Sequence, residues 1–144
     1  MGKTQLLKQT AFLMAMLCFP LMVAGQTIKG NENSGTVKVS GTSSLHDWEM
    51  KLAKFEASAN LEKNDDGSYT LSDASFLTDA EHLTSEKSMM ENKAHDALKS
   101  EDHPEIAFHQ TKENISLSPA DNNFQIRGDL TIAGQTRPVV MTLK

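Results

Sequence analysis

The chain has 144 residues, with 14 Lys and Arg against 19 Asp and Glu, which gives a formal net charge of −5. The basic residues form no cluster. Nucleic acid and anionic membrane surfaces are therefore poor partners, because both attract proteins through basic patches that displace counterions. The length is that of one domain.

The first 25 residues are predicted to form a secretory signal peptide that is cleaved before Gln26. Lys3 and Lys8 give a basic start, and residues 11–23 are an unbroken apolar run. This run is shorter than the roughly 20 residues of a membrane-spanning helix, so we expect cleavage and no stable membrane insertion. Cleavage also removes the single cysteine, Cys18. The resulting periplasmic or secreted chain has no disulfide, thiolate nucleophile or cysteine metal site.

The first half of the remaining chain alternates like strands, with one change of phase. Residues 26–35 are polar and contain glycine, so we expect a loosely ordered start and a first strand at 36–40. In residues 50–61 the apolar positions change from even to odd numbers near Ala53 and Lys54. One extra residue there, a β-bulge, would restore a common inward face. Bulges bend long antiparallel strands, which favours a barrel or a strongly curled sheet.

A single helix is predicted at about residues 85–99, between strands at 69–78 and 105–118. Thr84 or Ser85 can cap its start, and Pro104 prevents its continuation into the next strand. Its apolar residues recur at helical spacing and form one stripe along the helix: Met90, Ala94, Ala97 and Leu98. This stripe leaves open whether the helix is a lid over a cavity or a plug that fills the core.

The last two strands are predicted to form a hairpin. Alternate residues of 124–132 are apolar or glycine, and the pattern resumes from Val139 to Leu143 after a short turn at residues 133–135. Each strand therefore has one buried and one solvated face. Together these elements predict a mainly β protein, an antiparallel barrel with one inserted α-helix.

The histidines are the main candidates for metal binding or catalysis. Most are scattered over predicted helix, loop and strand, without an HExxH motif or a cysteine partner, and the chain has no GxSxG motif. We therefore expect no enzyme activity, no metal site and no cofactor. His46, Asp47 and Trp48 form the remaining cluster. They either contact a ligand head group at the mouth of the barrel or form a turn with Trp48 in the core.

Short segments at characteristic spacing link the chain to a known family. They are Gly41–Trp48, Ser88–Met90, Ala97–Ser100, Pro104–Phe108, Gly128–Gly134 and Arg137–Val139. In this order they resemble the YceI-like family over most of residues 36–143. The resemblance implies a domain at 26–144 with a lipocalin-like barrel around an apolar tunnel. It also implies that the protein binds a polyisoprenoid or similar amphiphile in the periplasm, without established catalytic residues.

On this interpretation, the apolar positions line a tunnel and do not fill a solid core. Small residues at Ala57, Ala59 and Gly128 leave room for a guest between the phenylalanines. The alternative is an accessory or structural protein with a packed barrel whose surface binds another exported protein. The predicted ligand-binding residues are His46, Trp48, Phe55, Phe76, Met90, Leu98, Phe108, Phe124, Ile126 and Leu130.

The chain departs from the family at its C-terminal end. The family continues past the strand with Arg137 and Pro138 into further strands that help to close the barrel, whereas this sequence stops at Lys144. About six strands are predicted, and a closed barrel with a ligand cavity usually has about eight. We therefore expect the sequence to be C-terminally incomplete. The alternative is an open edge that a partner chain pairs with, as in a homodimer.

Overall fold

The computed structural model describes residues 25–44, 46–111 and 113–143. The predicted signal peptide lies outside the described residues apart from Gly25. In the described part of the chain the fold is mainly β with one α-helix, as the sequence predicts. The strands are β1 (Gln26–Asn31), β2 (Lys38–Thr42), β3 (Asp47–Leu52), β4 (Glu56–Lys63), β5 (Tyr69–Asp79), β6 (Leu83–Thr84), β7 (Glu105–Gln110), β8 (Ile115–Leu117), β9 (Phe124–Ile132) and β10 (Gln135–Leu143).

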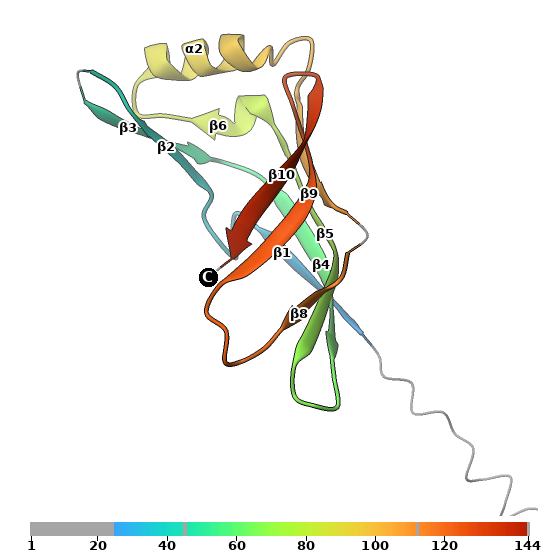
Figure 1. Cartoon of the computed structure of the whole chain (residues 1–144). Coiled ribbons are helices and arrows are strands. Elements are labelled where there is room, and N and C mark those ends of the chain that lie inside the picture. Colours follow the sequence, from blue (N-terminus) through green and yellow to red (C-terminus); the bar gives the residue numbers. More distant parts are fainter. Residues whose placement is uncertain (1–24, 45, 112, 144) are drawn as a thin grey trace, which may run out of the picture.

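The strands form two antiparallel sheets. The large sheet has the order β1-β4-β5-β7-β9-β10, and β8 pairs with the first three residues of β5, Tyr69 to Leu71. The small sheet has the order β2-β3-β6. Figure 1 shows the small sheet beside α2 (Ser88–Leu98) at one end of the molecule. In the described residues, β1 and β10 are the free edges of the large sheet. In the described residues no backbone ladder joins these two edges, so the sheets are not closed into a barrel, which agrees with the incomplete or open-edged barrel that the strand count predicts.

The phase change at residues 50–61 has a different cause from the predicted bulge. The chain leaves the small sheet after Leu52 and enters the large sheet at Glu56. At this corner the N–H of Ala53 donates to the carbonyl of His82 at 2.8 Å, and Phe55 is buried. When the chain passes from one sheet to the other, the inward-facing apolar positions change from even to odd numbers, just as they would after one extra residue in a strand.

A bulge does occur, but in β5. Ser58 pairs with Ser75 and Asn60 with Ser72, so β5 carries one residue more than β4 in this interval. Asp73 has a φ of 52°, and its carboxylate accepts a hydrogen bond from the Asn60 side chain at 2.9 Å. The bulge lets odd and even positions of β5 share one buried face.

Three further strand predictions are tested by the large sheet. The predicted hairpin is confirmed as β9–β10, with a two-residue turn in which Ala133 and Gly134 have φ values of 50° and 74°, typical of a type I′ turn. The predicted strand at 105–118 is interrupted and forms β7 and β8, which both pair with β5. The expectation of a loosely ordered start is wrong, because residues 26–31 are the edge strand β1, paired to β4.

The helix α2 is shorter than predicted at its start. It begins after Lys87, whose side chain makes no capping bond, so the predicted caps at Thr84 and Ser85 are wrong. Ser85 nevertheless organises the approach to the helix: its N–H donates to Glu91 Oε2 at 2.9 Å, and its hydroxyl accepts from the N–H of Lys87 at 3.2 Å. Lys99 ends the helix in the left-handed conformation, with a φ of 54°.

The apolar stripe of α2 faces the small sheet. Met90, Ala94 and Leu98 are half-buried, while Ala97 is exposed and does not belong to the stripe. His95 is half-buried and also faces the small sheet. Its Nε2 donates a hydrogen bond to the carbonyl oxygen of Leu83 in β6 at 2.8 Å. No helix among the described residues is long and apolar enough to span a membrane.

Candidate functional site

One face of the large sheet carries apolar side chains from every strand in its path. We call this face the inner face, and the register places on it Ile28, Ala57, Ala59, Phe76, Phe108, Ile126, Leu130, Val139, Met141 and Leu143. The strands alternate, so each contributes every second residue except across the bulge in β5. The inner face is therefore continuous from β1 to β10.

The centre of the inner face is packed. Phe108 and Ile126 are each 3% exposed and form a buried cluster with Ala59 and Leu71. Gly128 is required beside them, because a Cβ at this position would overlap the Phe108 ring and the His109 carbonyl oxygen. The predicted ligand residues Phe76 and Leu130 pack against the same cluster.

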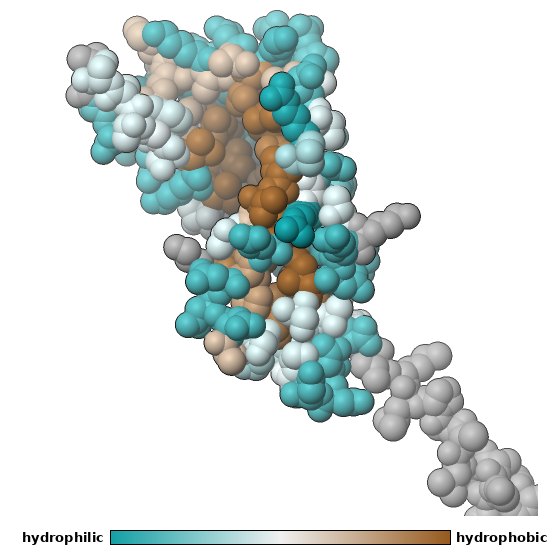
Figure 2. Space-filling view, viewed as in Figure 1, coloured by the Kyte–Doolittle hydropathy of each residue, from teal (hydrophilic) through white to brown (hydrophobic). Residues whose placement is uncertain are grey.

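The two edges of the inner face are uncovered. Ile28 in β1 is 46% exposed, and Met141 and Leu143 in β10 are each 38% exposed. Figure 2 shows apolar side chains gathered in a hollow bounded by the small sheet and the β9–β10 hairpin. Uncovered apolar surface of this kind is a candidate site for a ligand, a partner or a membrane.

An aromatic pair lies where the two sheets meet. The rings of Phe55 and Phe76 stack with centroids 5.7 Å apart and planes at 27°. Phe55 is buried at the corner before β4 and lines a pocket of about 300 Å³ with Thr78 and His82. Thr78 is itself buried, and its hydroxyl donates to the Lys54 carbonyl at 2.6 Å. This corner is therefore held by both stacking and a buried hydrogen bond.

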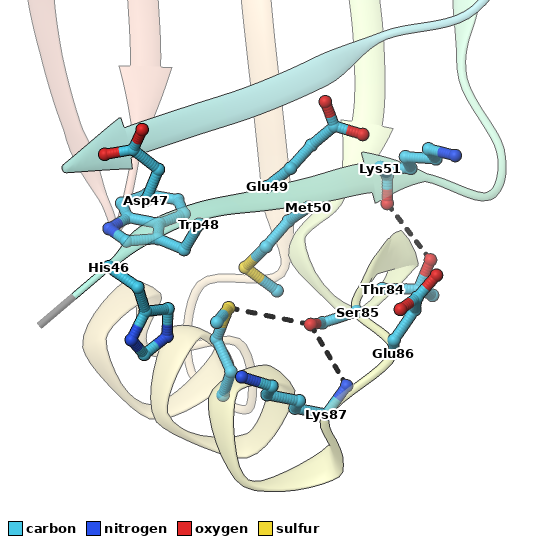
Figure 3. Close-up of a pocket in the computed structure, with 11 residues that line it drawn as sticks. His46, Asp47, Trp48, Glu49, Met50, Lys51, Thr84, Ser85, Glu86 and Lys87 are labelled. Carbon is cyan, nitrogen blue, oxygen red and sulfur yellow. Dashed lines mark hydrogen bonds between the residues drawn. The ribbon is translucent and has the colours of Figure 1, made fainter. Parts of the chain in front are cut away.

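A second pocket, of about 480 Å³, lies between β3 and the start of α2. It brings together three predicted ligand residues from distant parts of the chain: His46, Trp48 and Met90. Figure 3 shows His46 and Met50 on the side of β3 that faces the helix. Trp48 is half-buried in this pocket.

The remaining predicted ligand residues lie at the borders of these features. Phe124 is half-buried at the start of β9, opposite Leu143 of β10. Leu98 is half-buried in the last turn of α2. The structure thus divides the predicted set between the inner face, the corner of Phe55 and the pocket below α2. It does not bring these residues together in one closed tunnel.

The sequence interpretation missed several residues of the site. Ile28 was assigned to a loosely ordered segment, although its alternation with Thr27 and Lys29 is a usable strand signal. Met50 lies on the same face of β3 as His46 and Trp48, which their spacing of two residues could have revealed. Among the described residues, no three His, Cys, Asp or Glu side chains come close enough to hold a metal ion together.

Antiparallel sheets, a single helix at one end and an apolar hollow define a lipocalin-like class of protein. The family model of the YceI-like domain matches residues 22–144, and the chain therefore belongs to this family. The resemblance seen in the sequence is thereby confirmed. At the level of the family, membership supports a periplasmic protein that binds lipid or polyisoprenoid. A search among curated proteins finds no significant match to the chain.

Proposed function

We propose that this protein is an exported carrier that holds a polyisoprenoid or another amphiphilic lipid-like molecule against the inner face. The observation that supports the proposal is the uncovered apolar surface at both edges of that face, formed by Ile28, Met141 and Leu143. An apolar chain laid along this surface would remove it from water, and each Å² of apolar surface so buried contributes about 25 cal/mol.

The polar end of the ligand has a natural place in the pocket below α2. His46 and the ammonium group of Lys87 line this pocket beside the apolar walls of Trp48 and Met90. Met90 is unbranched and adaptable, which suits a wall that accepts a flexible guest. In this proposal the protein performs no catalysis: the side chains orient the ligand and exclude water, without a covalent step.

The alternative function is that of an accessory protein with a packed interior. It is favoured by the centre of the inner face, where Phe108 leaves no room for even a methyl group on Gly128. A partner protein would then cover the exposed edge strand β10, either a second copy in a homodimer or another exported chain. The two functions differ in what must occupy the surface around Met141.

A charge placed on the uncovered surface tests the carrier proposal. Met141→Lys puts an ammonium group on the inner face, whereas Thr142→Lys puts it on the opposite, exposed face of the same strand. Protein is incubated with a prenyl quinone, passed through a desalting column and extracted, and the retained quinone is quantified. We expect the wild type and Thr142→Lys to retain quinone and Met141→Lys to lose it.

Equal retention by both lysine variants would overturn the proposed binding surface. Native mass spectrometry of protein purified from its own periplasm provides the independent measurement. A co-purifying prenyl chain supports the carrier. A ligand-free protein that also fails to retain quinone in vitro supports the accessory function.

A further inference from the structure

Four side chains in the pocket below α2 form a combination that amphiphile binding does not require. Trp48 and Met50 lie two residues apart in β3 and so share one face of the strand. His46, directly before β3, lines the same pocket. Met90 approaches from the first turn of α2 and lines the same pocket. An imidazole, an indole and two thioethers therefore line a single pocket, although their segments are far apart in the sequence.

We propose that this pocket is a binding site for Cu(I), with His46, Met50 and Met90 as its ligands. Thioethers are soft, neutral donors that select Cu(I), and imidazole is also a good copper ligand. The described residues include no cysteine, so thioether sulfur is the soft donor that this fold has to offer. The inference is independent of the proposed carrier function.

The two sulfur atoms are held in place before any ion arrives. Met50 is 2% exposed, so its side chain is fixed by packing. The sulfur of Met90 accepts a hydrogen bond from the Ser85 hydroxyl at 3.5 Å. In Figure 3 two dashed lines meet at the Ser85 hydroxyl, and this bond is the one that ends on a sulfur atom. The Met50 side chain extends into the same gap between β3 and the helix. A thioether has a second lone pair, which remains for the ion, and Ser85 acts as a positioning residue.

Trp48 forms a fixed wall of the site. It lies opposite Gly41 in the β2–β3 ladder, and a Cβ on Gly41 would come within 2.5 Å of its Cζ2 atom. The close approach to the β2 backbone holds the indole where it borders the pocket. An indole face attracts a cation and shields it from water, which suits a monovalent ion with a neutral set of ligands.

The charged side chains around the pocket nearly balance one another. Its lining includes three carboxylates, Asp47, Glu49 and Glu86, and two ammonium groups, Lys51 and Lys87. Glu49 is engaged by Lys38 at 3.1 Å on the exposed side of β3. In Figure 3 the carboxylates of Asp47 and Glu49 point away from the helix, while the His46 and Met50 side chains lie between the strand and the helix.

The experiment uses the full chain carrying Cys18→Ser, which removes the only thiol. Ag(I), a soft ion that needs no reductant, is titrated while the fluorescence of Trp48, the only tryptophan, is followed. Cu(I) is then measured by competition with a colorimetric chelator such as bathocuproine disulfonate. We expect saturable binding of one ion per chain and quenching of Trp48 fluorescence.

Leucine variants identify the ligands while preserving the apolar volume. Met50→Leu and Met90→Leu should each weaken binding by about 100-fold or more, and Ser85→Ala by about tenfold. Met89→Leu is the matched control, because Met89 adjoins Met90 but is 71% exposed; its affinity should equal that of the parent. His46→Gln should weaken Cu(I) binding without unfolding the chain.

Absence of saturable binding would overturn the inference, as would binding that Met50→Leu and Met90→Leu leave unchanged. Met141→Lys separates this site from the proposed carrier function, because Met141 does not line the pocket below α2. This variant should lose quinone retention while it still binds Ag(I) with the parent's affinity. A chain that binds no quinone but still binds Ag(I) through Met50 and Met90 supports the metal site and refutes the carrier.

Discussion

Alanine at position 128 is expected to destabilise the fold, although alanine is normally the better residue within a strand. A compatible Gly→Ala substitution stabilises a protein by about 0.4 to 1 kcal/mol, because it restricts the unfolded chain. At Gly128 the new Cβ would overlap the Phe108 ring and the His109 carbonyl oxygen. Phe108 is 3% exposed and has no free space to enter. His109 is fixed by its pairing with Asp129 in the β7–β9 ladder.

Overpacking of this kind typically costs about 1 to 3 kcal/mol. For a domain of this size the melting temperature should fall by roughly 3 to 15 °C. The control is Gly35→Ala, because a Cβ there meets no atom within 4 Å and Gly35 does not have a positive φ. That variant should melt at the temperature of the wild type or slightly above it.

Chemical denaturation of both variants and the wild type provides the measurement. The double variant Gly128→Ala with Phe108→Leu then identifies the obstacle. If the Phe108 ring is the obstacle, the double variant will be more stable than the sum of the single effects predicts. A Gly128→Ala protein as stable as the wild type would refute the close packing on which this reasoning rests.

Two further predictions concern the faces of β9 and the turn before β5. Ile126→Asp should unfold the protein, because an unpaired buried carboxylate costs several kcal/mol. Arg127→Ala should change the free energy of unfolding by at most about 0.5 kcal/mol, since its ion pair with Glu113 is exposed. Equal urea midpoints for the two variants would show that the faces of β9 are misassigned. The pKa of Asp66 is lowered below its usual 3.8 by hydrogen bonds from the hydroxyl and the backbone N–H of Ser68. Its contribution to stability is thus present above the unfolded pKa and is lost as the pH falls through the folded pKa. The stability difference between the wild type and Asp66→Ala should be constant near neutral pH and shrink below about pH 4, and a difference that grows on acidification would contradict this assignment.

The elements that the sequence predicts well are those whose signal is local. The β9–β10 hairpin follows from alternation on both sides of a turn with Gly134, and the helix follows from a stripe that includes Met90 and Leu98. The edge strand β1 was missed because its exposed face is polar and its segment ends in a turn. An edge strand needs fewer apolar residues than a central one, so its pattern is weaker.

The elements that the sequence could not place depend on contacts between distant segments. A reversal of apolar parity is the same whether a strand bulges or the chain changes sheet, so Ala53 alone does not distinguish them. The pocket below α2 needs β3 and the helix to lie side by side, and this follows from the pairing of Leu52 with Leu83 in β6. The combination of Met50 with Met90 is a product of that pairing and has no local signal.

The buried centre of the inner face contributes to the stability of the fold, whereas its exposed edge at β10 is available for the proposed binding. Where Phe108 and Ile126 are already buried, the hydrophobic free energy is gained on folding, so substitutions there lower the stability of the fold. Where Met141 and Leu143 remain exposed, the same type of side chain contributes about 25 cal/mol per Å² only when another molecule covers it. A substitution at Met141 can therefore abolish binding in a protein that still folds, whereas a substitution at Ile126 cannot separate the two. The strand alternation that builds the core thus also provides the proposed binding surface, and the exposure of each residue separates the two roles.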